Sequence, residues 1–256
     1  MVHIPVDPNA LLRFVLAFVR ATAWIVITPP FSNRAIPPMA KVGISAGLAM
    51  AAAGHATAGP VPLDTAGFVT ALLTQVATGV ALGMIVMVLF SAVEAAGSTI
   101  GMFGGFSLPP SIDLLSQNQS SALGQLYQLM AVTLLFSLGG DLLLVKGFMS
   151  SFGAVGWNLR TSGALGAVLT HDLSSFFTSA LLIASPLVVV LFLAQAVLGI
   201  LSRIAPQMNV MMLGFPFQIL LTIGLVMLGL TVIPDYLSQL LTQALGDGNT
   251  WMRAAG

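Results

Sequence analysis

Cysteine is absent from this chain of 256 residues, and charged residues are scarce. Only 6% of the residues are charged, and eight basic residues balance eight acidic ones, whereas a soluble domain carries about 25% charged residues. Without cysteine, a disulfide framework, a thiolate nucleophile and a thiolate metal site are all excluded. A formal net charge of zero offers no basic surface to nucleic acid, so we expect no nucleic-acid partner.

Apolar residues, in contrast, dominate the chain. They make up 57% of the sequence, and the mean hydropathy is +1.00. The composition predicts an all-α membrane protein, surrounded by lipid, with about six long, partly kinked helices arranged as hairpins. We expect one helical membrane domain over residues 1–245 and a disordered tail over residues 246–256. The longer apolar runs are residues 14–28, 66–103, 123–138, 174–201 and 208–233.

One arginine, Arg13, directly precedes the first apolar run, and a second, Arg20, lies inside it. Arg13 and Arg20 lie seven residues apart, on one face of a helix. A charge near mid-membrane costs about 2.5 to 3.5 kcal/mol on insertion scales, so that face should meet protein or water. We expect the side chain of Arg13 to extend to the membrane interface. For Arg20 two alternatives stay open, a buried structural partner or a functional contact.

Residues 199–216 lie between two long apolar runs, yet they contain polar residues and prolines that a membrane span should avoid. Because proline removes a backbone donor and clashes with the preceding turn, Pro206 and Pro216 should each break or kink a helix. Irregular backbone at membrane depth is tolerated only where protein buries it or where it lines a wet cavity. The segment therefore predicts a protein-facing seam or a pore lining. Its candidate residues are Arg203, Pro206, Gln207, Asn209, Gly214 and Pro216.

Small residues recur with helical spacing inside the 66–103 run. Gly97 and Gly101 are four residues apart, and Glu94 lies on the same helix face. Such a stripe lets a second helix backbone pack closely within a membrane. Glu94 has two interpretations, a proton-relay or ion-coupling carboxylate and an interhelical hydrogen-bonding group, of which the second is favoured. The segment that follows, residues 104–121, is rich in Ser and Gln and predicts a mobile connection between helices.

Two stretches carry a resemblance to a known family. Residues 203–210, which read Arg-Ile-Ala-Pro-Gln-Met-Asn-Val, and the Gly-Phe-Pro of residues 214–216 resemble the C-terminal signature of the FliR family of flagellar biosynthetic membrane proteins. The Gly-Phe-Ser of residues 105–107 is similar to a loop of that family, which forms part of the plug of an export pore. By this resemblance, the plug residues would be Gly104, Gly105, Phe106, Ser107, Leu108 and Ile112.

The same resemblance implies a function. The chain would be a structural and gating subunit of the bacterial flagellar type III protein export gate, forming part of the channel for unfolded substrates. Its partners would be homologues of FliP, FliQ and FlhB, with exported flagellar proteins as transient substrates. It would lie in the bacterial inner (cell) membrane, at the flagellar basal body. An export-gate subunit of a virulence-type secretion system is the close alternative.

Enzyme motifs are missing from the sequence. It has no Walker loop, no G-x-S-x-G or H-E-x-x-H motif and no dinucleotide-binding glycine pattern, and its three histidines are scattered. We therefore expect no catalytic residues, no metal and no cofactor. The alternative from a different class is a secondary transporter, with a substrate site at broken helices around Arg203, Asn209 and Glu94.

Overall fold

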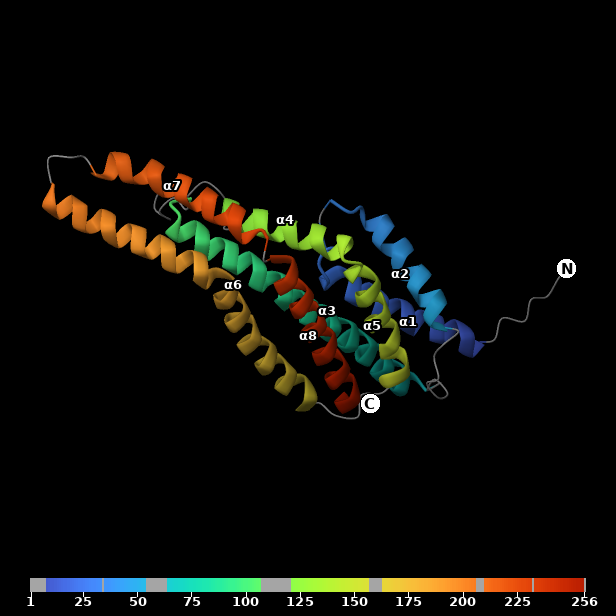
Figure 1. Cartoon of the computed structure of the whole chain (residues 1–256). Coiled ribbons are helices and arrows are strands. Elements are labelled where there is room, and N and C mark those ends of the chain that lie inside the picture. Colours follow the sequence, from blue (N-terminus) through green and yellow to red (C-terminus); the bar gives the residue numbers. More distant parts are fainter. Residues whose placement is uncertain are drawn as a thin grey trace. The chain divides into compact units, whose positions relative to one another are not determined.

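The computed structural model of the chain describes residues 8–33, 35–53, 64–106, 121–156, 163–205, 210–231 and 233–255. All regular structure in these ranges is helical, which confirms the predicted all-α fold (Figure 1). The described residues form α1 (Pro8–Ile27), α2 (Pro38–Ala53), α3 (Thr65–Phe103), α4 (Ala122–Ser137), α5 (Gly140–Ala154), α6 (Gly163–Ile204), α7 (Val210–Gly229) and α8 (Ile233–Ala255).

Four of these helices, α1, α3, α6 and α7, contain stretches long and apolar enough to cross a membrane. The number rises to five if α4 and α5 together form one broken span. The membrane class is thus as predicted, although the number of long helices in the described residues is slightly below the expected six. The difference arises because α2, α4 and α5 have only 16, 16 and 15 residues, whereas a span needs about 20.

The packing of the chain divides it into two compact units. Unit 1 consists of Met1–Val88, Gly139–Leu173 and Leu241–Gly256, and unit 2 consists of Leu89–Leu138 and Ser174–Leu240. The longest apolar helices differ in burial: 61% of the apolar window of α3 is buried, against 11% in α6. α3 is therefore a core helix, whereas α6 presents most of its surface outward.

α3 runs for 39 residues, and its sequence contains no proline that would remove a backbone donor from it. Asp64 caps its start, since one carboxylate oxygen accepts a hydrogen bond from the backbone N–H of Gly67 at 2.9 Å. In unit 1, α3 runs parallel to α1, with Gly79 against Arg20 and Gly83 against Ile27. A Cβ atom added at Gly79 would lie 2.5 Å from the Arg20 carbonyl oxygen, so only glycine permits this approach. α2 packs against α1 and α5.

Unit 2 contains two antiparallel helical hairpins. In the first, Gly97 on α3 lies against the carbonyl of Leu123 and the ring of Tyr127 on α4. In the second, Gly214 on α7 lies against Leu198 on α6, and closer to the other end of the pair Gly229 lies against Leu187. The outer surface of α6 and α7 is apolar, with exposed residues that include Phe177, Leu181, Phe192, Val197, Phe217, Leu220 and Met227.

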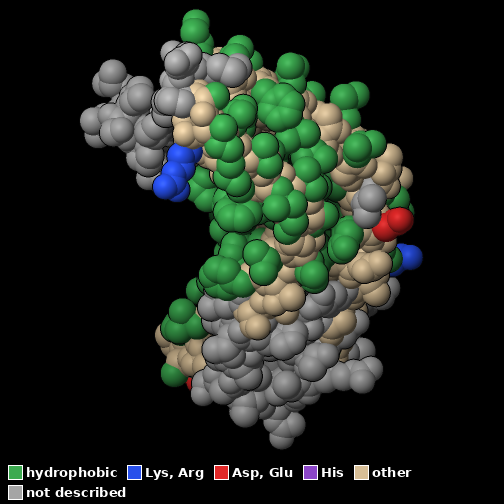
Figure 2. Space-filling model, turned by 60° about the vertical axis from the view of Figure 1, so that its left-hand side comes forward, with side chains coloured by type: hydrophobic (Ala, Val, Ile, Leu, Met, Phe, Trp, Pro, Cys, Tyr) green, Lys and Arg blue, Asp and Glu red, His purple; other side chains and the backbone are tan. Residues whose placement is uncertain are grey.

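The view in Figure 2 shows hydrophobic side chains over most of the described surface that it presents, with few charged groups among them. Monomeric soluble proteins rarely expose apolar patches larger than a few hundred Å². The outer faces of α6 and α7 are therefore suited to contact with lipid or with other membrane helices.

α8 (Ile233–Ala255) extends beyond residue 245, where the sequence predicted the helical domain to end. It continues to Ala255 and so includes most of the residues for which the sequence predicted a tail. Leu237, Leu241 and Met252 are buried along it, and their spacing of four and eleven residues places them on one face. Burial of this apolar stripe stabilises the helix beyond Gly246, a residue type that is unfavourable inside helices.

Candidate functional site

The first candidate site is the start of the segment formed by residues 104–121. We call this whole segment the plug loop, after the role that the resemblance predicts for it. α3 ends at Phe103, and Gly105 has a φ of +78°, in the left-handed region that favours glycine. The backbone N–H of Phe106 donates to the carbonyl of Gly101 at 3.0 Å. A glycine in the left-handed region, followed by a residue whose N–H bonds the carbonyl five residues earlier, is the Schellman motif that ends many helices. The chain therefore leaves α3 in a defined direction.

Three side chains from α6 and α7 bind the carbonyls at this helix end. The side-chain amide of Gln195 donates to the Phe103 carbonyl at 3.0 Å, and that of Gln218 donates to the same oxygen. The hydroxyl of Thr222 donates to the Gly104 carbonyl at 3.2 Å. The last four carbonyls of a helix lack partners within the helix, so these side chains supply what the backbone cannot. We call Gln195, Gln218 and Thr222 the carbonyl clamp.

The clamp is closely packed as well as hydrogen-bonded. Thr222 is fully buried, and Gln218 is only 9% exposed. A Cβ atom at Gly104 would lie 2.6 Å from the side chain of Thr222, so glycine is required for α7 to approach the end of α3. Because Gln218 and Thr222 are four residues apart, they project from one face of α7 toward this end.

The return of the plug loop to the helices is also fixed. Ser121 caps the start of α4, because its hydroxyl oxygen accepts a hydrogen bond from the backbone N–H of Gly124 at 3.0 Å. Gly101 lies close to Ser121, since a Cβ atom there would be 3.2 Å from the Ser121 hydroxyl. The two ends of the plug loop are therefore held beside the same turn of α3.

The structure brings some of the sequence-predicted residues to this place. Gly97 and Gly101 face α4 beside the plug-loop ends, and Glu94 is half-buried one turn before Gly97. Gly104, Gly105 and Phe106 form the exit from α3. Three candidate plug residues, Ser107, Leu108 and Ile112, lie outside the described residues.

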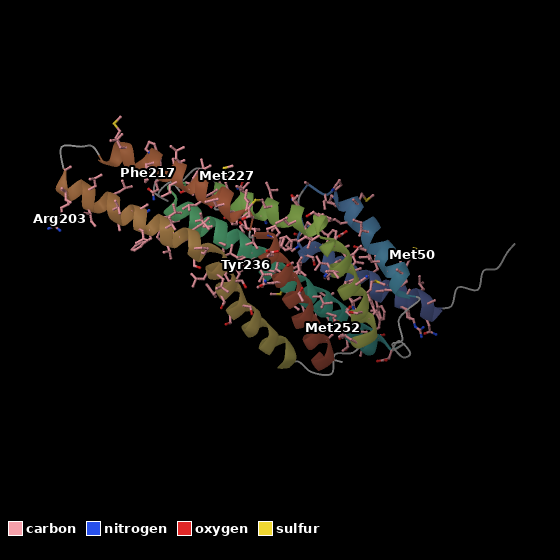
Figure 3. The ribbon with its side chains drawn as sticks, in the orientation of Figure 1. Met50, Arg203, Phe217, Met227, Tyr236 and Met252 are labelled. Atoms are coloured by element: carbon pink, nitrogen blue, oxygen red, sulfur yellow. The ribbon has the colours of Figure 1, made fainter. Side chains whose placement is uncertain are left out.

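The seam residues predicted around residue 203 lie elsewhere in unit 2. Arg203 is exposed in the last turn of α6 and points away from the helix (Figure 3). Gly214 is buried against Leu198, and Pro216 is exposed within α7. Pro206, Gln207 and Asn209 fall outside the described residues.

Sequence reasoning missed the carbonyl clamp. Its members are isolated polar side chains within long apolar helices. In the sequence, such residues cannot be distinguished from residues that form a single hydrogen bond to a neighbouring helix. The available signal was the spacing of Gln218 and Thr222, which places two hydrogen-bonding groups on one face of an otherwise apolar segment. Their partners could not be read from the sequence, because the Gln218 amide and the Phe103 carbonyl are 115 residues apart.

A second buried polar centre lies in unit 1, around the fully buried Arg20. Its guanidinium donates to the Gln75 side-chain oxygen at 2.7 Å and to the carbonyl and hydroxyl of Ser151 at 2.9 and 3.2 Å. It also donates to the carbonyls of Val155 and Gly156 at 3.0 and 3.4 Å. Three of these acceptors are backbone carbonyls at or just beyond the C-terminal end of α5, where a cation interacts favourably with the helix dipole.

Aromatic side chains complete the surroundings of Arg20. Its guanidinium carbon lies 4.4 Å from the centre of the Phe152 ring, a cation–π geometry. Phe152 meets Phe148 edge-on, with ring centres 5.3 Å apart, and Phe148 stacks on Trp24 at 4.6 Å. Of the two alternatives for Arg20, the described contacts match the buried structural partner, because every contact given for its side chain is to the protein's own interior.

No cluster of three or more His, Cys, Asp or Glu side chains that could hold a metal ion occurs in the part of the chain that the structure describes. Both polar centres contain side chains that donate hydrogen bonds to backbone carbonyls at a helix end. Each centre fixes the end of one helix with side chains from others.

Comparison with known proteins gives consistent matches over most of the chain. The family model described as bacterial export proteins, family 1, matches residues 11–244. Flagellar biosynthetic protein FliR of Escherichia coli (strain K12) is 28% identical, covering 88% of this chain and 86% of that protein. FliR of Bacillus subtilis (strain 168) is also 28% identical, with 86% of each chain covered. Surface presentation of antigens protein SpaR of Shigella flexneri is 26% identical over 82% of this chain and 81% of that protein.

Proposed function

Because the chain belongs to family 1 of the bacterial export proteins, we propose that it is the structural and gating subunit of a flagellar type III protein export gate. Relatives named flagellar biosynthetic protein FliR match about nine-tenths of its length. The observation that carries the gating role is the plug loop, whose two ends are fixed beside one turn of α3. The channel itself would pass unfolded export substrates.

The proposed mechanism uses the plug loop as a closure. A loop that blocks a channel at rest needs a base that does not move and an apolar tip that can leave the path. The Schellman turn and the Ser121 cap supply the base, and Phe106, Leu108 and Ile112 would supply the apolar tip. The sequence has no nucleotide-binding motif, so the energy for export would come from other components and from the proton motive force.

The partners we propose are homologues of FliP, FliQ and FlhB. The exposed apolar faces of α6 and α7 suit contact with other membrane helices. The seam residues around position 203 would contribute to these subunit contacts, with the exposed Arg203 at the end of α6 as one of them. The assembly would lie in the bacterial inner membrane at the flagellar basal body, and its role would be structural rather than catalytic.

Co-purification tests the assembly. The tagged full-length chain is extracted in mild detergent, and native mass spectrometry identifies what accompanies it. The proposal expects FliP- and FliQ-type subunits in a complex of defined stoichiometry. A chain that runs alone or as a symmetric homodimer would contradict the proposal and would favour the transporter alternative.

Deletion of residues 106–112 tests the closure. We expect cells that carry this deletion in an assembled gate to leak small ions, because the apolar tip of the plug loop is removed. Uptake of a membrane-impermeant dye or collapse of the ion gradient measures the leak. An intact permeability barrier in cells with a fully assembled deletion variant would rule out the plug assignment.

A virulence-type export gate is the second candidate, because SpaR relatives also match. The two systems differ in what they build rather than in any residue described above. Removal of the chain's gene should abolish flagella and swimming if the flagellar proposal holds. Motile cells that have lost only a virulence-type secretion product would favour the second candidate.

A further inference from the structure

We propose that the carbonyl clamp and the end of α3 together form a binding site for a monovalent alkali cation, Na⁺ or K⁺. The ligands would be the backbone oxygens of Phe103 and Gly104, the Thr222 hydroxyl and the side-chain oxygens of Gln195 and Gln218. All five residues belong to unit 2 and to the described part of the chain. Such a site goes beyond the proposed function and does not depend on it.

The gathering of neutral oxygen atoms is the first reason. The side-chain amides of Gln195 and Gln218 both contact the Phe103 carbonyl oxygen. The Thr222 hydroxyl lies 3.2 Å from the Gly104 carbonyl oxygen. Carbonyl and hydroxyl oxygens at broken or ending helices are the ligands with which membrane proteins replace the hydration shell of K⁺ and Na⁺.

The charge at the helix end is the second reason. The C-terminal end of a helix carries a partial negative charge of roughly half an elementary charge. At the end of α5 in unit 1, the guanidinium of Arg20 brings a positive charge to the carbonyls of Ser151 and Val155. The side chains that donate to the carbonyls at the end of α3 are all neutral. A bound cation would give the end of α3 the charge that Arg20 gives to the end of α5.

The chain itself does not bring a basic side chain to the end of α3 in the residues described for unit 2. Arg203 is the basic residue of these ranges, and it is exposed in the last turn of α6, eight residues beyond Gln195. Eight residues of helix correspond to about 12 Å. The positive charge would therefore come from an ion in solution.

A shortage of donors at the Gly104 carbonyl is the third reason. The Thr222 hydroxyl lies 2.7 Å from the Gln218 carbonyl on its own helix, and only 3.2 Å from the Gly104 carbonyl. A hydroxyl has one proton, which the shorter contact uses. Two acceptor oxygens of buried residues, those of Thr222 and Gly104, then lie 3.2 Å apart without a proton between them. A cation that contacts both oxygens would remove their repulsion.

The two glutamines can serve the site with and without the ion. A side-chain amide has a nitrogen that donates and an oxygen that accepts, and a half-turn of the terminal group exchanges the two. The nitrogens donate to the Phe103 carbonyl in the structure. A Cβ atom at Gly105 would lie 3.8 Å from the Gln218 side-chain oxygen, so that oxygen already lies beside the end of α3. With a cation bound, the amide oxygens would turn toward it.

The neutrality of the ligands selects the class of ion. A buried divalent cation needs carboxylate ligands to offset its lost hydration, and Glu94 lies nine residues before Phe103, too far along α3 to reach the site. Transition metals prefer nitrogen and sulfur ligands. The sequence-based expectation of no metal concerned histidines and carboxylates, and it did not consider neutral oxygens of this kind.

Thermal unfolding of the purified full-length chain tests the site. NaCl or KCl replaces choline chloride at constant ionic strength, so that general screening by salt stays the same. A ligand that binds only the folded state stabilises it in proportion to the logarithm of its concentration once the site is mostly occupied. Each tenfold increase in Na⁺ or K⁺ in that range should raise the unfolding midpoint by about 3–5 °C. Binding of radioactive sodium or rubidium to the same preparation measures the ion directly.

Variants locate the ion within the chain. Thr222→Val and the double variant Gln195→Met, Gln218→Met should lose the alkali dependence, because they remove ligand oxygens, whereas Thr222→Ser should keep it. Gln195→Glu adds a negative charge, which should lower the half-saturating ion concentration by roughly tenfold. Gln239→Met on α8 and Thr231→Val just beyond α7 are matched controls, since both side chains are exposed, and they should respond to the ions as the original chain does.

Equal midpoints in alkali and choline salts, with no binding of the radioactive ions, would overturn the site and leave the clamp as a hydrogen-bonded helix cap. An alkali effect that persists in Thr222→Val and in the double variant would overturn the assignment too, because the ion would then bind elsewhere. If these variants do not fold, Gln195→Glu decides, and an unchanged half-saturating concentration contradicts the site. Failure of the co-purification test would remove the proposed function and leave the ion dependence of the single chain in place.

Discussion

In each of the two units, side chains from other helices bind backbone carbonyls at the end of one helix, but the side chains differ in charge. In unit 1, the charged side chain of Arg20 binds the C-terminal end of α5 through a fully buried network. In unit 2, the neutral side chains of Gln195, Gln218 and Thr222 bind the C-terminal end of α3. Both helix ends have carbonyls that lack partners within their helix, and both receive donors from other helices.

The two centres differ in the free energy that is needed to break their hydrogen bonds. Arg20 makes five hydrogen bonds and a cation–π contact, and opening would leave a guanidinium in an apolar interior, at large cost. The clamp carries no charge, and one of its donors keeps an acceptor after release. We therefore expect the charged centre to contribute more to stability than the neutral one. Four predictions follow from this contrast, from the largest effect to the smallest.

Arg20→Met should produce the largest loss of stability. Without the guanidinium, the Gln75 side-chain oxygen and the Val155 carbonyl lose their donors. An unsatisfied buried acceptor costs about 1–3 kcal/mol, so the total should be about 2–6 kcal/mol. Thermal unfolding of the purified chain in detergent measures this loss of stability. The stability of Arg20→Lys should lie between those of the original chain and Arg20→Met, since an ammonium keeps the charge but cannot form the planar, forked hydrogen bonds of a guanidinium.

The control for this prediction is Arg203→Met, which removes an exposed arginine of α6. It should change the midpoint of unfolding of the isolated chain little. Equal effects of Arg20→Met and Arg203→Met would show that the buried network does not stabilise unit 1 as described.

Gly79→Ala in unit 1 and Gly97→Ala in unit 2 should cause the next largest loss of stability. A Cβ atom would lie 2.5 Å from the Arg20 carbonyl oxygen in the first and 2.7 Å from the Leu123 carbonyl oxygen in the second. Backbone atoms cannot yield as a flexible side chain can, so we expect each variant to lose about 1–3 kcal/mol of stability.

Gly47→Ala and Gly224→Ala are the matched controls, because a Cβ atom at either position meets nothing within 4 Å. Alanine is the better helix former by about 1 kcal/mol, so these two variants should be neutral or more stable in the same unfolding assay. Destabilisation of the controls to the same degree as Gly79→Ala would remove the close-packing explanation.

The double variant Gln195→Met, Gln218→Met should lose less stability than Arg20→Met. It leaves one partly buried carbonyl, that of Phe103, without its two side-chain donors, which costs at most about 1–3 kcal/mol. Unfolding of the purified chain checks the ranking. A loss equal to that of Arg20→Met would contradict the view that the clamp is the weaker of the two joints.

Ser121→Ala should have the smallest effect of the four. It removes the side-chain acceptor for the Gly124 N–H at the start of α4, and loss of such a cap costs about 1 kcal/mol. Ser150→Ala is the control, since the exposed Ser150 hydroxyl bonds only the Gly147 carbonyl within its own helix. Identical unfolding midpoints for the two variants would show that Ser121 does not stabilise this end of the plug loop.

Much of the fold followed from composition. A chain with 57% hydrophobic and 6% charged residues had to be a membrane protein, and the apolar runs located most of the long helices. α5 was harder to anticipate, because it follows α4 after a break at Gly139, where the backbone adopts a φ of +69°. Apolar residues occur on both sides of α5, with Leu142 and Leu143 exposed beside the buried Leu144, Phe148 and Phe152, so its inward face did not stand out in the sequence.

The sites were less predictable than the fold, since they depend on contacts between distant parts of the chain. The cost of a buried charge required a protein or water partner for Arg20, but nothing local identified carbonyls 131 and 135 residues away. The plug loop was visible in the sequence as a polar segment between apolar runs. The clamp that holds its base was not, because its donors come from two helices that follow much later.

The most direct test of the account asks whether the plug loop lies on the path of an export substrate. In the cysteine-free chain, Phe106→Cys is combined with an export substrate that carries one cysteine and is arrested in the gate. Met50→Cys serves as the control, because Met50 is 70% exposed on α2 in unit 1 (Figure 3). With an added thiol oxidant, a disulfide should form between position 106 and the arrested substrate, and none should form from position 50. Equal cross-linking from both positions, or none from position 106, would contradict the account.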